Sequence, residues 1–182
     1  MSKYLFIFFF VVLISDTNAN NKEKIIKNLK NTRNLNFQFE QNINGEVERG
    51  NCTIEYPKKI FCKYLKSNNK ILVSNGKSLV IKTTSSYYQY PLKKTVLNLI
   101  LNKKILLTKI DSLEERIIDE LYINYTIIEN NNKINIFFDN QTFFLVGWQT
   151  KDIYQNLNMT FLSSIKINQV INKNLFKLPP QN

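Results

Sequence analysis

The side chains best suited to acid-base catalysis gather in one short stretch of the chain. Five carboxylates fall between residues 111 and 120: Asp111, Glu114, Glu115, Asp119 and Glu120. A pair of them would suit a hydrolase that needs one general acid and one general base. Acidic residues also favour the dipole at a helix start and are otherwise solvated. The second interpretation accounts for the whole cluster, so we assign it no catalytic role.

Other catalytic and metal-binding chemistries are excluded by composition. The chain has no histidine, which removes His-dependent triads, His metal ligands and imidazole acid-base chemistry. Its glycines are few and far apart, and no phosphate-binding glycine loop can be built from them. They are Gly45, Gly50, Gly76 and Gly147. We expect a protein that is not an enzyme and that holds no metal and no cofactor.

The N-terminus has the order of a secretory signal peptide. A short charged start, an apolar run from Tyr4 to Ile14 and the small residues before Asn20 predict a cleaved leader at 1–19. The apolar run is too short to span a bilayer, which needs roughly 20 residues. We therefore expect a single exported domain at 20–182, located in the periplasm.

The elements of the first half read mainly as strands. A short amphipathic helix is expected at 22–31, and period-two alternation over 35–43 then predicts a strand. A hairpin turning at Pro57-Lys58 follows, and a second one turns at Asn75-Gly76, which suits a type I′ turn. Residues 87–90 are expected to pair next.

Cys52 and Cys62 lie on opposite arms of the first hairpin with the same face parity. Side chains of a cross-strand pair approach closely enough for a bond between the two sulfurs. We therefore predict one disulfide, which leaves no free thiol for catalysis or zinc binding.

Helical spacing interrupts the strands in mid-sequence. Leu92, Val96, Leu99 and Ile100 predict an apolar-faced helix, and Ser112 with Glu115 predicts a capping box for one further turn. Strands then resume over 122–128, 134–138, 143–150, 157–161 and 165–167. The pattern indicates a mainly antiparallel β fold of nine to eleven strands with a few helices on one side.

Bulky aromatic residues are abundant on the predicted strands. An ordinary core explains most of them, and a sheet curved around an apolar hollow is the alternative. Stacking on single-stranded nucleic acid is a third reading for a chain of net charge +11. The lysines are scattered along the sequence and are not interleaved with the aromatics, so we expect no nucleic-acid partner. The residues concerned are Phe37, Phe39, Tyr88, Tyr90, Phe138, Phe144, Trp148 and Phe161.

The stretch ILVSNGKSL at 71–79 resembles a hairpin of the periplasmic outer-membrane lipoprotein carrier family, LolA. Neighbouring features occur in the same order over nearly the whole mature chain. They are Phe39-x-Gln41, Gly50 through Ile54 to Pro57, Tyr90-Pro91-Leu92, Asp139 to Gly147 before Asp152, Asn168 to Phe176, and Leu178-Pro179.

The resemblance implies an unclosed half-barrel whose apolar concave face is lidded by helices and holds the acyl chains of lipoproteins. It implies a monomer that is loaded by the inner-membrane transporter LolCDE and unloaded by the outer-membrane acceptor LolB. Many members carry an arginine before the proline of the second strand as a lid latch, whereas this chain has Tyr56 there. Lys58, Lys59 and Lys63 are nearby candidates for another latch, and the alternatives are a weaker lid or a divergent lipid binder with other cargo.

We predict that inward-facing strand residues and the mid-sequence helix line the cavity. Phe39→Glu should then leave the protein folded while abolishing acyl binding. The predicted lining is Leu35, Phe37, Phe39, Ile54, Val73, Leu79, Tyr88, Tyr90, Leu92, Val96, Leu99, Ile100, Phe138, Trp148 and Phe161. A lipid- or protein-sensing protein of the same fold is the first alternative function, and a secreted basic nucleic-acid binder is the second.

Overall fold

The computed structural model describes residues 20–65, 68–129, 132–151 and 156–181. The predicted signal peptide lies outside these residues. Three α-helices occur in the described part: α1 (Asn21–Asn31), α2 (Leu97–Leu101) and α3 (Lys103–Ser112), with a 3-10 turn, η1 (Leu92–Lys94), before α2. None of the helices described is long and apolar enough to cross a membrane.

Eleven strands make up the rest of the regular structure in the described residues. They are β1 (Asn34–Ile43), β2 (Glu46–Glu55), β3 (Lys59–Tyr64), β4 (Ile71–Asn75), β5 (Ser78–Lys82), β6 (Tyr87–Pro91), β7 (Arg116–Ile118), β8 (Tyr122–Glu129), β9 (Asn132–Asp139), β10 (Leu145–Lys151) and β11 (Leu157–Ile167).

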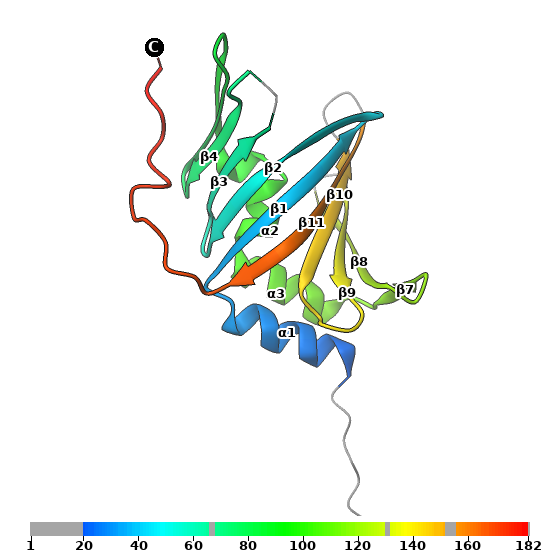
Figure 1. Cartoon of the computed structure of the whole chain (residues 1–182). Coiled ribbons are helices and arrows are strands. Elements are labelled where there is room, and N and C mark those ends of the chain that lie inside the picture. Colours follow the sequence, from blue (N-terminus) through cyan, green and yellow to red (C-terminus); the bar gives the residue numbers. More distant parts are fainter. Residues whose placement is uncertain (1–19, 66–67, 130–131, 152–155, 182) are drawn as a thin grey trace, which may run out of the picture.

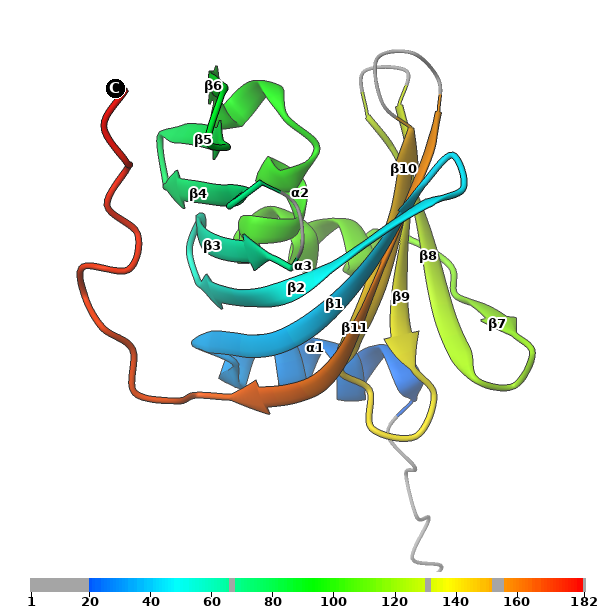
Figure 2. The same ribbon diagram turned by 45° about the horizontal axis from the view of Figure 1, so that its top comes forward.

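All of these strands belong to one antiparallel sheet in the order β6-β5-β4-β3-β2-β1-β11-β10-β9-β8-β7. The sheet curves strongly but does not close, since β6 and β7 remain its two edges (Figure 1). The helices lie on the concave side, with α2 and α3 inside the curve and α1 along its lower rim (Figure 2). The predicted half-barrel is therefore confirmed.

β1 sets the two faces of the sheet. Leu35, Phe37 and Phe39 are no more than 5% exposed, whereas Gln38 between the two phenylalanines and Glu40 after them are exposed. Successive side chains of a strand point to opposite faces, so this alternation defines a buried concave face and a convex outer face.

The predicted disulfide is present between Cys52 of β2 and Cys62 of β3. The two residues are direct cross-strand partners, with their Cα atoms 4.1 Å apart. Phe37 pairs with Cys52 on the other side, so both cysteines share the concave face with the aromatic row of β1.

The second hairpin is confirmed, but the predicted type I′ turn is wrong. The last residues paired between β4 and β5 are Ser74 and Leu79, so four residues separate them. Of these four, only Gly76 has a positive φ, of +98°. A type I′ turn requires a positive φ at both central residues. Asn75 instead caps the loop, because its Oδ1 accepts hydrogen bonds from the backbone N–H groups of Lys77 and Ser78, both at 3.0 Å.

The mid-sequence helix is split rather than continuous. Thr95 is extended and its hydroxyl donates to the carbonyl of Leu92 at 2.8 Å, which ends η1 before α2 begins. The predicted capping box at Ser112 is wrong, because Ser112 is the last residue of α3 and Glu115 precedes β7. Sequence analysis missed α3, although Leu106 and Ile110 are fully buried at helical spacing.

The C-terminal segment leaves β11 and crosses the outer face of β3 to β6 (Figure 1). Lys82 Nζ donates to the backbone carbonyl of Pro180 at 2.9 Å, and the hydroxyl of Tyr87 donates to the backbone carbonyl of Pro179 at 3.4 Å. Phe176 is only 5% exposed. The C-terminal segment therefore covers part of the outer face at this end of the sheet.

Candidate functional site

The pairing register decides which predicted residues face the helices. Starting from β1, cross-strand partners place nine strand residues of the predicted cavity on the concave face, and the remaining four of that side come from η1, α2 and the residue before α2. They are Leu35, Phe37, Phe39, Ile54, Leu79, Tyr88, Tyr90, Phe138 and Trp148, with Leu92, Val96, Leu99 and Ile100.

Two of the predicted cavity residues lie on the opposite, outer face. Val73 pairs with Phe61 and Val80, and it is buried without being part of the core cluster that includes the lid and α3. Phe161 pairs with Glu40, and its ring stacks on Phe137 with centroids 6.1 Å apart. Alternation of apolar residues cannot reveal this, because both faces of the sheet bury apolar side chains here.

The concave face is closed by its own side chains. Phe39 is 5% exposed and its ring meets that of Tyr64 edge-on, with centroids 4.9 Å apart. Leu99 and Ile100 of α2 are at most 4% exposed. The residues expected to line a hollow are thus packed as a core, and Phe39→Glu is now expected to unfold the protein.

Only the β6 edge of the predicted lining is open to solvent. Tyr88 and Tyr90 are 53% and 45% exposed, although their pairing with Ile81 and Leu79 puts them on the concave face. No strand follows β6 in the described sheet, so nothing packs over these two rings from the sheet side.

A polar cluster closes the opposite end of the concave face beside the β1–β2 turn. Lys70 Nζ lies 2.6 Å from a Glu48 carboxylate oxygen and 4.2 Å from the centroid of the Tyr64 ring. The Tyr64 hydroxyl donates to Gln41 Oε1 at 3.3 Å. Burial, and then the charge of Glu48, raise the pKa of Tyr64 well above its ordinary value. Sequence analysis did not single out this cluster.

The segment η1–α2 has few polar ties to the sheet. The N–H of Leu92 donates to the carbonyl of Lys77 at 2.9 Å, and the N–H of Lys58 donates to the carbonyl of Leu101 at 2.8 Å. Otherwise the segment is kept against the sheet by burial of the apolar side chains of Leu92, Leu99, Ile100 and Leu101. We call residues 92–101 the lid.

Helix α3 is fixed much more firmly. At its start, Lys103 Nζ donates to the carbonyls of Lys30 and Thr32 at 3.1 and 3.0 Å. At its end, Lys22 Nζ donates to the carbonyl of Asp111 at 3.2 Å, and just beyond it Glu115 accepts from Asn21 at 2.9 Å.

The carboxylate cluster therefore has a structural use. Glu115 also accepts from the hydroxyl of Tyr125 on β8 at 3.1 Å, and burial with this neighbour raises the pKa of Tyr125. Among the described residues, no group of acidic residues and cysteines is arranged to hold a metal ion.

Asn102 joins the lid to α3. Its backbone departs from helical angles, with φ −93° and ψ 85°, and its Oδ1 accepts from the N–H of Ile105 at 3.5 Å as the α3 cap. A loosely held lid thus meets a fixed helix at one non-helical residue.

Tyr56 occupies the position of the family's latch arginine, and its cationic neighbour comes from α3. Lys103 Nζ lies 5.6 Å from the centroid of the Tyr56 ring. The Tyr56 hydroxyl is buried and has no hydrogen-bond partner in the described structure, and burial raises its pKa. Burial also lowers the pKa of Lys103. No sequence signal pointed to Lys103, because α3 was not predicted.

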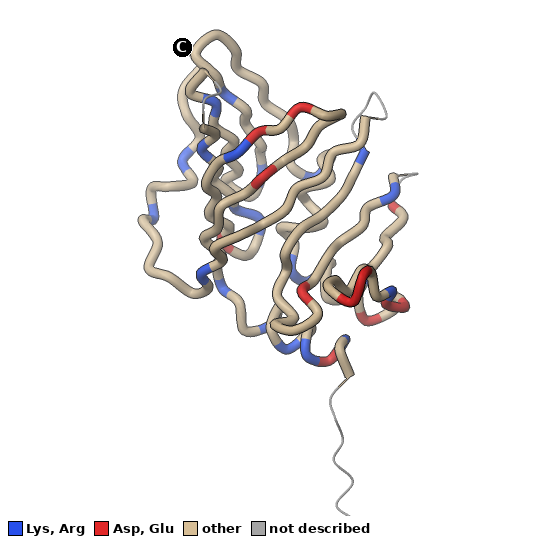
Figure 3. The backbone as a smooth tube through the Cα atoms, turned by 45° about the vertical axis from the view of Figure 1, so that its right-hand side comes forward, with Lys and Arg blue, Asp and Glu red and all other residues tan. Residues whose placement is uncertain are grey.

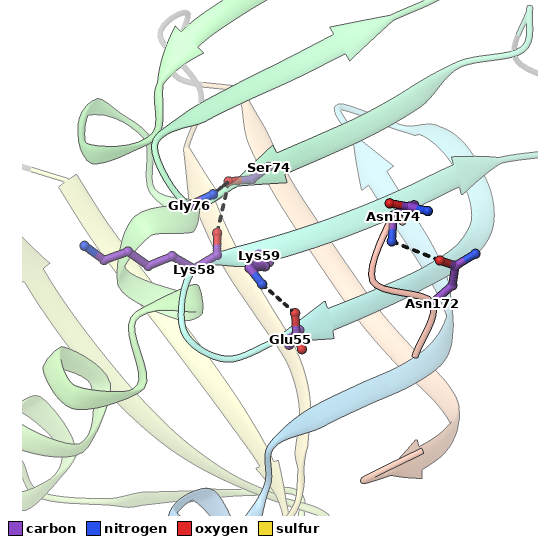
Figure 4. Close-up of polar contacts among 7 residues, drawn as sticks. All are labelled: Glu55, Lys58, Lys59, Ser74, Gly76, Asn172 and Asn174. Carbon is purple, nitrogen blue, oxygen red and sulfur yellow. Dashed lines mark hydrogen bonds and ion pairs between the residues drawn. The ribbon is translucent and has the colours of Figure 1, made fainter. Parts of the chain in front are cut away.

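The three lysines named as candidates to replace the arginine make other contacts or are exposed, and Figure 4 shows two of them, Lys58 and Lys59. Lys59 Nζ pairs with Glu55 at 2.9 Å on the outer face and lies 5.6 Å from the ring centroid of Phe176. Lys58 contributes its backbone carbonyl, which accepts from the hydroxyl of Ser74 at 3.0 Å. Lys63 is exposed on the outer side of β3.

Comparison with solved structures finds the same fold at low sequence identity. An uncharacterized conserved protein from Thermus thermophilus is 10% identical, with a TM-score of 0.53 over 87% of this chain and 92% of that one. A LolA superfamily protein from Nitrosomonas europaea is 10% identical with a TM-score of 0.44 over 87% and 99%. LprF from Mycobacterium bovis is 14% identical with a TM-score of 0.44 over 84% and 96%.

Among curated proteins, none matches the sequence. The model of one protein family does match, and it covers residues 17–179, which include every helix and strand of the described structure. The chain belongs to the family of the outer membrane lipoprotein carrier protein LolA.

Proposed function

We propose that this protein is a non-enzymatic carrier that holds the acyl chains of lipoproteins between the concave face of its sheet and its helices. One observation carries the proposal: a broad apolar concave face is covered by a short lid that two backbone hydrogen bonds tie to the sheet turns. A core built only for stability has no need of a weakly tied cover.

The energies of opening and of loading are of the same size. Burying a Leu or Ile side chain contributes about 1.5–3 kcal/mol, so lifting the four buried lid residues costs roughly 6–12 kcal/mol. An acyl chain of about sixteen carbons gains roughly 12 kcal/mol when it leaves water, at ~0.8 kcal/mol per CH₂. A chain that takes the place of the lid's contacts can therefore hold the lid open.

Opening would pivot at Asn102. Helix α3 stays bound to α1 through Lys103 and to β8 through Glu115, while η1 and α2 turn away from Leu35, Phe37 and the rest of the concave face. Transfer of this kind requires no reacting side chain.

We place this activity in the periplasm, after export directed by residues 1–19. The donor would be the inner-membrane transporter LolCDE and the acceptor the outer-membrane protein LolB, with the carrier acting as a monomer. Depletion of the protein should then mislocalise lipoproteins. Correct localisation after depletion, together with retained acyl binding, would instead indicate a lipid-sensing protein of the same fold.

The single tryptophan of the chain provides a direct test of the site. Trp148 lies on the concave face and is 7% exposed. A triacylated lipopeptide brominated along its acyl chains should quench Trp148 fluorescence at a ratio near one per protein, and the same lipopeptide without bromine should not. Stoichiometric binding without quenching would refute the placement, and absence of binding would refute the function.

A pair of matched variants tests the lid. Leu99 of α2 and Val80 on the outer face of β5 are both almost fully buried. Leu99→Ala should destabilise the closed state of the protein by about 3 kcal/mol, a typical value for this change in a core. If half of this loss lowers the free energy needed to open the lid, lipopeptide association should be about tenfold faster. Val80→Ala destabilises the fold without touching the lid, and should leave the association rate unchanged.

A further inference from the structure

One long stretch of this protein is rich in lysine and free of acidic residues. Between Glu55 and Asp111 the sequence contains no acidic residue, and every charged side chain there is a lysine. This stretch forms β3 to β6, the lid and α3. The acidic residues of 111–120 follow at once, and Figure 3 shows them at the far end of the molecule from β3 to β6.

The C-terminal segment adds to the positive end. Residues 168–181 contain Lys173 and Lys177 and no acidic residue, and they lie over the outer face of β3 to β6. The fold thus brings the lysines of the C-terminal segment to the same side as those of β3 to β6.

One edge of this positive end combines exposed lysines with exposed tyrosines. Lys93 and Lys94 are exposed on η1, and the exposed Lys77 in the β4–β5 turn is held beside them by the hydrogen bond from the N–H of Leu92. Tyr88 and Tyr90 are 53% and 45% exposed on the adjoining strand β6. We call Lys77, Tyr88, Tyr90, Lys93 and Lys94 the basic edge. None of its three lysines forms an ion pair within the described part of the chain.

We propose that the basic edge docks the protein on the surface of an anionic phospholipid leaflet. Lysines near such a surface are attracted to it, and tyrosine is enriched at membrane interfaces because its ring is apolar and its hydroxyl is polar. The edge bears no arginine, the side chain that binds phosphates in a bidentate manner, so the chemistry suits a diffuse layer of charge better than one fixed site.

Docking in this orientation would bring the lid to the membrane. Lys93 and Lys94 belong to its first turn, so contact with headgroups places the start of the lid at the lipid surface. Acyl chains could then pass from the bilayer to the concave face with little exposure to water. This purpose rests on the proposed function, but the surface can be tested with empty protein and lipids that carry no lipopeptide.

The test is vesicle flotation with the mature protein. Vesicles of phosphatidylglycerol and phosphatidylethanolamine should bind it at low salt, and vesicles of phosphatidylcholine should not. Replacing Lys77, Lys93 and Lys94 by Gln should weaken the partition about 100-fold, because each lysine near an anionic surface contributes about fivefold. Replacing Tyr88 and Tyr90 by Ser should weaken it further at high salt, where the lysines are screened.

The matched control removes the same charge elsewhere. Lys27, Lys133 and Lys151 are exposed and lie on α1, β9 and β10, away from the basic edge. Their replacement by Gln should change the partition less than about threefold, since they lie far from the docked surface. Equal loss in both triple variants, or no flotation with anionic vesicles, overturns the proposal. So does tight binding of a short oligonucleotide through the basic edge without any binding to vesicles.

Discussion

Lys103 is one of the cations that join α3 to the rest of the molecule, together with Lys22 and Lys109, and its removal tests how the lid is supported. Lys103→Met keeps most of the aliphatic stem but removes the ammonium group, leaving the carbonyls of Lys30 and Thr32 without their partner. Those carbonyls are at the C-terminal end of α1, where a positive charge is also favourable to the helix dipole.

The magnitude follows from the two hydrogen bonds. Bonds that involve a charged group contribute about 1.5–3 kcal/mol each when buried. Lys103 is partly exposed and water can reach the freed carbonyls, so we expect a total loss of about 1–2 kcal/mol. For a domain of this size that corresponds to a fall in Tm of roughly 2–8 °C.

The neighbouring Lys104 provides the control. It is exposed and forms no ion pair among the described residues, so Lys104→Met should change the free energy of unfolding by less than about 0.5 kcal/mol. Urea denaturation of both variants gives the comparison, and Lys103→Arg should recover part of the loss. Equal stability of the two Met variants would refute the assignment of Lys103 as the support of α3.

Three further outcomes follow from buried or hydrogen-bonded groups. Tyr56→Phe removes a buried hydroxyl that has no partner and should stabilise the protein by about 1 kcal/mol in urea denaturation, whereas a loss of stability would show that the hydroxyl is bonded. Replacing Cys52 and Cys62 by Ala should cost about 2–3 kcal/mol, and reduction of the wild type should give the same shift in denaturation midpoint. Burial raises the pKa of Asp139, but hydrogen bonds from the hydroxyl and amide groups of its turn outweigh this and hold it below the ordinary 3.8. The stability advantage of the wild type over Asp139→Ala should therefore be full above pH 3.8 and disappear as the pH falls through the lowered pKa, and an advantage that persists in acid would contradict this.

The strands were predictable because one face of the sheet is buried over most of its strands. In β1 the period of two is unbroken from Leu35 to Phe39, and the same logic located both hairpins and the partners Cys52 and Cys62. The turn at Asn75-Gly76 was predicted with the wrong conformation because Asn75 has a second use, as an acceptor for two backbone N–H groups. Side-chain capping of this kind competes with the turn geometry that the dipeptide alone favours.

The sequence predicted the apolar helical residues of the lid but not helix α3, which supports it. Helix α3 carries lysines at both of its first two positions and has only a narrow buried stripe, formed by Leu106 and Ile110. Its place depends on contacts with α1 and β8, and the residues of α1 are far away in the sequence. Local periodicity contains no information about such contacts. For the same reason the sequence did not predict that Lys103 of α3 would lie beside Tyr56, at the position where an arginine was expected.

Most of the predicted cavity lining lies on the concave face, yet its residues are packed together rather than spread around a hollow. An apolar wall and an apolar core demand the same residues, since each excludes water from the same side chains. Phe39 packs edge-on against Tyr64, and Leu99 is buried within the same core cluster. The proposed carrier would bury its apolar wall in this way against the lid when no acyl chain is bound. Packing in the unloaded form is therefore compatible with a binding role. What separates a lid from an ordinary core helix is the number of its polar contacts. Two backbone hydrogen bonds tie residues 92–101 to the sheet turns, whereas α3 has the bonds of Lys103, Lys22 and the ion pair of Lys109.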